Sequence, residues 1–154
     1  MILQGALFLW AAWLFFNGGS ASLFAPRYTG PAKIIIINFL APATGGLVAV
    51  LLKPRITGTY SAVQKLDITT MCNGVLCGLV SVTSSCDELE VWCGPIVAAI
   101  GVTFYSIGCL IMEKIEVDDP CEAFPLHTGG GLWGTLAVGL FSNVNGLFYN
   151  PDIS

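Results

Sequence analysis

Apolar residues along this chain gather in five long stretches that short polar connections separate. The stretches cover residues 2–24, 34–52, 68–85, 91–112 and 123–142. A helix needs about 20 mostly apolar residues to cross the roughly 30 Å hydrocarbon core of a bilayer. The pattern therefore predicts an all-α, polytopic membrane protein, with five spans in residues 1–142 and a polar tail over 143–154.

The third stretch is too polar to face lipid. Its hydroxyl and amide side chains are Thr69, Thr70, Asn73, Ser81, Thr83, Ser84 and Ser85. Gly74 and Gly78 are four residues apart, and Gly130 and Gly134 repeat this spacing in the fifth stretch. Small residues at this spacing let helices approach closely inside a bilayer, where apolar side chains give no drive to associate. We expect Asn73, Gly74, Gly130 and Gly134 to serve packing between helices.

Composition supports a membrane protein, and the charges predict its orientation. Charged residues make up 10% of the chain, against about 25% in ordinary soluble domains. The segment 53–65 is basic without an acid, whereas 87–90 is acidic without a base. By the positive-inside rule, we expect 53–65 in the cytoplasm and 87–90 outside. Alternation of the spans then places 113–122 in the cytoplasm and the tail outside. The net charge of −4 is spread over the connections and indicates no nucleic-acid partner.

The six cysteines show no spacing typical of a metal site or a redox motif. Free cysteine behaves as a small hydrophobe, so we expect most of them at packed helix positions. Cys86 and Cys93 flank one short connection, and their spacing also allows a disulfide. We expect no metal, no cofactor and no enzyme activity, because no nucleophile or second base is placed to work with the single histidine.

That histidine, His127, lies near the start of the fifth stretch. It follows Asp119 by eight residues, so a helix that starts at Asp119 carries it about 12 Å into the membrane. One interpretation is a buried imidazole bonded to a backbone carbonyl. The other is a group that lines a path for ions, protons or substrate, the usual role of an ionisable residue at bilayer depth. The glycines at 129–131 leave room beside His127 and favour the second interpretation.

Phe16 and Ser20 are four residues apart near the end of the first stretch and share a helix face. One interpretation is an interfacial aromatic ring and a hydroxyl at a helix end. The other is the mouth of a pore, where an aromatic face and an oxygen suit a small cation. The residues alone leave both interpretations open.

Asp118, Asp119 and Pro120 precede the fifth stretch. We expect a structural role, in which Asp119 accepts backbone N–H bonds at the helix start and Pro120 is the first helical residue. Both carboxylates are also stabilised by the positive end of the helix dipole. Such a cap fixes the helix that carries His127.

Four motifs, taken together, resemble the ammonium transporter (Amt/Mep/Rh) family. They are DDP at 118–120, LHTGGGLWG at 126–134, NGVLCGLV at 73–80 and FNGGS at 16–20. The resemblance follows the family's order and spacing and covers nearly the whole chain. One departure is Thr128, which stands where the family often has glycine.

The resemblance implies an eleven-helix fold of two inverted five-helix repeats and a last helix, assembled as a trimer with one pore per subunit. This chain resembles helices six to ten, and its odd number of spans agrees with one repeat of an inverted-repeat transporter. By this resemblance His127 is the second of two stacked pore histidines, Phe16 a gating aromatic and Ser20 the hydroxyl of the outer ammonium site. The expected substrate is ammonium or ammonia, and the expected location is the lipid bilayer of the plasma membrane.

The family's other pore residues, including its first histidine, belong to the first repeat, which this chain does not resemble. We therefore expect a first repeat or homologous subunits as partners. The alternative is a non-transporting membrane subunit or vestigial fragment that binds a partner through its glycine-rich helix faces.

Overall fold

The computed structural model describes residues 1–24, 31–58 and 67–150, which form five α-helices and no strand. The helices are α1 (Ile2–Phe24), α2 (Pro31–Ile56), α3 (Ile68–Thr83), α4 (Cys93–Lys114) and α5 (Ala123–Phe141). Each helix falls on one of the five apolar stretches. The predicted all-α fold is confirmed.

The helix α2 extends beyond the predicted range at both ends. It starts at Pro31, and proline suits a first helical position because its missing N–H needs no partner there. Its last turn contains Lys53 and Arg55. The lysines at 33 and 53, which bound the predicted stretch, are therefore part of the helix, and each is held at a fixed place near one of its ends.

The described helices differ in how well they suit a membrane. By length and composition, the described parts of α1, α2 and α4 can each cross a bilayer. The apolar helix α3 is shorter, at 16 residues. The helix α5 has 19 residues, but glycines, threonines and His127 dilute its apolar character. The expected membrane location agrees with these helices, while the crossing of the bilayer by α3 and α5 stays a prediction.

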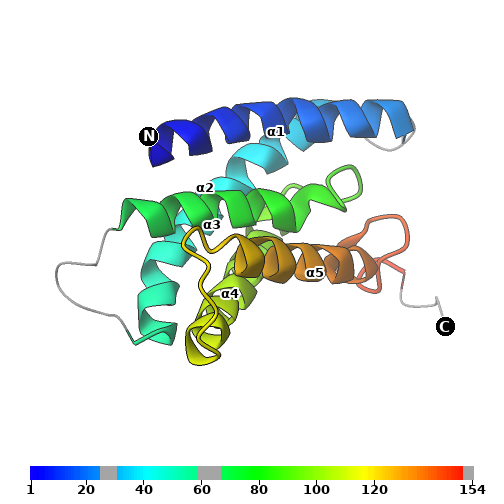
Figure 1. Cartoon of the computed structure of the whole chain (residues 1–154). Helices are drawn as coiled ribbons and strands as arrows, with labels where there is room; N and C mark the ends of the chain where they lie inside the picture. The colour runs from blue at the N-terminus through cyan, green and yellow to red at the C-terminus, as the bar shows by residue number, and fades with distance from the viewer. Residues whose placement is uncertain (25–30, 59–66, 151–154) are drawn as a thin grey trace.

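Figure 1 shows α3 between α1 and α5, with α2 and α4 crossing behind this row. The central helix α3 contacts each of the other four helices. Its polar side chains Thr70, Asn73 and Ser81 are accordingly buried, as expected for a stretch that faces protein. Among the described residues, α1 contacts only α2 and α3. The helix α1 therefore forms one edge of the unit.

Small residues bring α2 and α3 into backbone contact. A Cβ atom added to Gly78 would lie 2.7 Å from the carbonyl oxygen of Ala41. One added to Gly45 would meet the backbone of Gly74, and one added to Gly74 would meet the Cβ of Ala49. The small residues recur every four positions on both helices, which is the spacing that permits close approach.

The helix α5 packs on α3 in the same way. A Cβ atom added to Gly134 would lie 2.6 Å from the carbonyl oxygen of Ser81, and one added to Gly130 would lie 3.0 Å from the sulfur of Cys77. Both glycines thus lie inside the unit, against its central helix.

All six cysteines are free thiols, and five of them are buried. The disulfide that the spacing of Cys86 and Cys93 allows is not formed. The sulfur of Cys86 lies 4.0 Å from the carbonyl oxygen of Asn17, and that of Cys93 lies 3.8 Å from the hydroxyl of Tyr149. The two side chains contact different neighbours, and the expectation that most cysteines occupy packed positions as free thiols is confirmed.

The segment that follows α5 packs back on the bundle. The backbone N–H of Leu147 donates to the carbonyl of Gly139, and the rings of Phe141 and Phe148 lie 5.2 Å apart. Residues 143–150 thus contact the end of α5. The boundary between domain and tail at residue 142 stays a prediction, and residues 151–154 lie outside the described ranges.

Candidate functional site

The start of α5 differs from the expected cap. The carboxylate of Asp119 accepts the backbone N–H of Phe124 at 2.8 Å. However, Pro120 is not the first helical residue, because the N–H of Glu122 donates to the carbonyl of Asp119 at 2.9 Å and closes a turn first. The helix begins three residues later, at Ala123. Asp118 is exposed on this connection.

This later start shortens the stretch of helix that precedes His127. The histidine is the fifth residue of α5, about 6 Å along its axis from Ala123 instead of the expected 12 Å. The side chain is exposed in the five-helix unit. A buried imidazole held by a backbone carbonyl therefore does not describe His127, and the ring is accessible to whatever covers this face.

Phe16 is also exposed, with 59% of its surface accessible, whereas Ser20 is partly buried. The ring of Phe16 lies edge-on to that of Trp13, with centroids 6.3 Å apart. The Trp13 indole donates to the hydroxyl of Thr83 on α3 at 2.8 Å. The exposed ring of Phe16 is thus placed on a helix that is tied to the centre of the unit.

Two asparagines give α1 a second polar anchor, which the sequence interpretation missed. Asn17 is buried, and its amide donates to the side-chain oxygen of Asn38 on α2 at 2.8 Å. The indole of Trp10 donates to the carbonyl of Asn38, also at 2.8 Å. Buried amides in apolar helices must find partners. The presence of Asn17 and Asn38 in two apolar stretches was therefore the available signal.

The structure does not bring Phe16 and Ser20 into contact with His127. They lie on α1 and α5, and α3 separates these helices. Within the described ranges, no group of His, Cys, Asp and Glu side chains is arranged to hold a metal ion. This arrangement offers separate side chains on one unit, two of them exposed, rather than a closed site.

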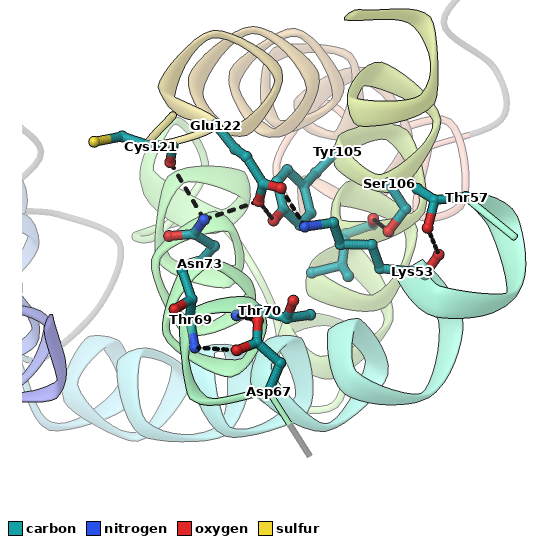
Figure 2. Close-up of polar contacts among 11 residues, drawn as sticks. Lys53, Thr57, Asp67, Thr69, Thr70, Asn73, Tyr105, Ser106, Cys121 and Glu122 are labelled. Atoms are coloured by element: carbon teal, nitrogen blue, oxygen red, sulfur yellow. Dashed lines mark hydrogen bonds and ion pairs between the residues drawn. The ribbon is translucent and has the colours of Figure 1, made fainter. Parts of the chain in front are cut away.

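A polar cluster at the start of α5 joins four segments of the chain, as Figure 2 shows. Glu122 forms an ion pair with Lys53, from the last turn of α2, and accepts a hydrogen bond from the hydroxyl of Tyr105 on α4. The side-chain amide of Asn73 on α3 donates to Glu122 at 3.0 Å and to the carbonyl of Cys121 at 3.3 Å. We call Glu122, Lys53, Tyr105 and Asn73 the Glu122 cluster.

The charges within the Glu122 cluster compensate each other. Burial raises the pKa of Glu122, but the hydrogen bonds from Lys53 and Tyr105 and the charge of Lys53 outweigh it and hold the pKa below its usual range. The Lys53 ammonium also lies 5.5 Å from the centre of the Tyr105 ring, where cation–π attraction operates. Glu122 therefore stays ionised, with a partner for its charge.

Glu122 has an unusual backbone conformation for a residue with a side chain. Its φ of 54° and ψ of 32° are left-handed. This conformation costs an L-residue about 1 kcal/mol or more. Residues held this way persist where the surrounding contacts fix them. The three side-chain contacts of Glu122 supply such a constraint.

A second polar cluster lies near the other end of α2. Glu90, from the connection between α3 and α4, pairs with Lys33 at 2.8 Å and accepts the amide of Asn143 at 2.8 Å. The neighbouring Glu88 accepts the hydroxyl of Ser142 at 2.5 Å. We call Glu90, Lys33 and Asn143 the Glu90 cluster. It ties the start of α2 to the end of α5.

The comparisons with known proteins agree with the motifs. Residues 1–151 match the model of the Ammonium Transporter Family. A putative ammonium transporter from Synechocystis sp. is 36% identical over 91% of this chain and 24% of its own length. Ammonium transporter 1 member 3 from Solanum lycopersicum is 32% identical over 92% of this chain and 32% of its own length.

Solved structures show the same fold. The crystal structure of Saccharomyces cerevisiae Mep2 has a TM-score of 0.78 and 25% identity, and the match covers 99% of this chain and 32% of Mep2. Candida albicans Mep2 gives 0.76 and 27% over 91% of this chain and 29% of its own. The chain therefore spans 24% to 32% of the length of these relatives. With the family model matched over nearly every residue, the chain belongs to the ammonium transporter family.

Proposed function

We propose that this chain forms one half of a transport path for ammonium or ammonia, with His127, Phe16 and Ser20 facing the path. The proposal is carried by the family match over residues 1–151. The exposure of His127 and Phe16 supports it, because these side chains lie on the surface of a packed five-helix unit, where a facing unit can cover them. A protein with this role is a transporter and not an enzyme.

The proposed path suits a cation that gives up its proton. The hydroxyl of Ser20 can accept an N–H bond, and the face of Phe16 attracts a cation. A charged group at the bilayer centre costs about 3 kcal/mol on insertion scales, whereas neutral ammonia carries no such charge. His127 offers one nitrogen that donates and one that accepts, which suits a passing molecule of ammonia or a proton.

The facing unit is, in this proposal, a first five-helix repeat or a homologous subunit. Three complete pores then form a trimer in the plasma membrane. The Gly74, Gly78, Gly130 and Gly134 faces are already used inside the unit, so they are not open to a partner. For this reason we favour transport over a non-transporting subunit that binds through these glycines.

Methylammonium uptake into vesicles tests the proposal. The chain is reconstituted alone and joined behind a first repeat from a relative, and we expect saturable uptake only from the joined form. His127→Ala and Phe16→Ala should change its rate or its selectivity against potassium. Phe15→Ala is the matched control, because Phe15 is the neighbouring ring and is 82% exposed.

Wild-type flux and selectivity in both pore variants would contradict the assignment of these residues. Saturable uptake by the chain alone, abolished by His127→Ala, would instead show that copies of this chain complete the path for each other.

A further inference from the structure

We propose that Glu122 is a positioning residue, whose carboxylate fixes the inner end of α5 and thereby the imidazole of His127. The importance of His127 rests on the proposed function, but the placement itself is a property of the fold. Glu122 directly precedes α5, and His127 follows it by five residues, about one and a half turns. A movement of the first turn is therefore passed directly to the imidazole.

One carboxylate connects the start of α5 to three other helices. Lys53 comes from α2, Asn73 from α3 and Tyr105 from α4. Within the described residues, the bodies of α2 and α5 do not pack against each other. The ion pair of Glu122 with Lys53 is therefore a direct bridge from α2 to the start of α5.

Other contacts also hold the first turn of α5, among them the bond from the Phe124 N–H to the carboxylate of Asp119. Ala123, Phe124 and His127 are exposed. Pro125 and Leu126 are buried, and the side chain of Pro125 packs close to Gly108 of α4. These two apolar contacts fix the distance of the turn from α4. The directional bonds of Glu122 add a constraint on its rotation about the helix axis, because hydrogen bonds depend on angle. The close contacts of Gly130 and Gly134 with α3 constrain the later turns.

The left-handed backbone at Glu122 supports the same inference. Glycine adopts this conformation without strain. A glutamate here is strained, and its side chain is held by three partners at once. If the position served only to turn the chain into α5, glycine would serve better. What distinguishes Glu122 is that three partners hold its side chain in this conformation.

The test follows the imidazole itself. His127 is the only histidine of the 154 residues, so histidine labelled with ¹³C and ¹⁵N gives one signal from this chain in solid-state NMR spectra of the joined protein in lipid bilayers. Loss of that signal in His127→Gln identifies it. We expect Glu122→Gln to shift or broaden the signal, and Tyr105→Phe, which removes a single hydrogen bond, to shift it less.

Two further variants separate positioning from general stability. Glu122→Gly relieves the backbone strain but removes the carboxylate, so we expect it to displace the imidazole signal even in preparations that stay folded. Glu113→Gln is the matched control. It removes an exposed charge from the last turn of α4 and should leave the signal in place.

An unmoved imidazole signal in folded Glu122→Gln and Glu122→Gly would overturn the proposal, as would an equal shift in Glu113→Gln. If Glu122→Gln does not fold, Tyr105→Phe decides in its place. Uptake measurements on His127→Ala keep the two proposals apart. If the Glu122 variants shift the signal and His127→Ala keeps normal uptake, the positioning holds and the pore role is refuted. If the Glu122 variants leave the signal unmoved and His127→Ala changes uptake, the pore role holds and the positioning is refuted.

Discussion

The two ends of α2 carry similar ion pairs in different surroundings. Lys33 and Lys53 are separated by 20 residues, or about 30 Å of helix, the thickness of a hydrocarbon core. In the Glu90 cluster the side chains of Lys33 and Glu90 are 21% and 39% exposed. In the Glu122 cluster those of Lys53 and Glu122 are 12% and 27% exposed. Glu122 also has partners on α3 and α4, while Glu90 has one further partner, after α5.

The comparison indicates that similar pairs do different work. Solvent screens an exposed pair, which is typically worth about 0.2–1 kcal/mol. Removing one partner of a buried pair leaves an uncompensated charge, and the penalty is larger than the pair's own contribution. We infer that the Glu90 cluster holds the connection between α3 and α4 in place, whereas the Glu122 cluster sets the position of α5.

The strongest way to break this comparison is to show that the clusters do not lie on opposite faces of the membrane. In our orientation, Lys114 is cytoplasmic and Asn145 is outside, and both are exposed. With Cys121 replaced by serine, Lys114→Cys should react with an impermeant thiol reagent only after the membrane is opened. Asn145→Cys should react on intact cells. Labelling of both from one side would show that the Glu122 cluster and the Glu90 cluster do not lie on opposite faces of the membrane.

The next largest effect is expected from the Glu122 cluster. Glu122→Gln leaves the half-buried ammonium of Lys53 without its counter-charge, and should lower the free energy of unfolding by about 2 kcal/mol. The measurement is the midpoint of thermal unfolding in detergent. Lys53→Gln together with Glu122→Gln should lose less than the sum of the single variants, because the pair is then absent as a whole.

A smaller change is expected from the Glu90 cluster. Glu90→Gln keeps the hydrogen bond from Asn143 and loses only the more exposed of the two ion pairs, so the unfolding free energy should fall by less than about 1 kcal/mol. When the thermal measurement is repeated at high salt, which screens the ion pair, Glu90→Gln should be almost as stable as the unsubstituted chain. A loss equal to that of Glu122→Gln would mean that exposure does not separate the two clusters.

The smallest expected effect is on the pH dependence of stability. Hydrogen bonds from Lys33 and Asn143 lower the pKa of Glu90, and the contacts of Glu122 lower its pKa despite burial. Groups with a lowered pKa stabilise the fold fully above their ordinary pKa, which is 4.5 here. This stabilisation is lost as the pH falls through the folded pKa. Melting midpoints should therefore hold steady from pH 7 to about pH 5 and then fall, with a shallower fall in Glu122→Gln.

The elements of this fold were predictable because their signals are local. The apolar stretches gave the helices, and the polar third stretch gave the central one. The Glu122 cluster was not predictable, because its contacts join residues far apart in the sequence. The ion pair joins residues 69 apart, and the hydrogen bond from the Asn73 side-chain amide joins residues 49 apart. The basic segment from Lys53 carries an orientation signal, and no local pattern distinguishes Glu122 from the acids at 118–119. The cap of α5 was misplaced, because residues 119–122 form a turn that contains Pro120 and the helix begins only after it.

The glycine contact between α2 and α3 has a mechanical consequence. Where Gly45 meets Gly74 and Gly78 meets Ala41, backbone lies against backbone, and no long side chain is present to change rotamer and absorb a displacement. Such a joint has almost no compliance, so α2 and α3 should move as one rigid block. Any opening or closing motion of a complete transporter would then fall between this block and its neighbours, with α1 as the most loosely attached of them.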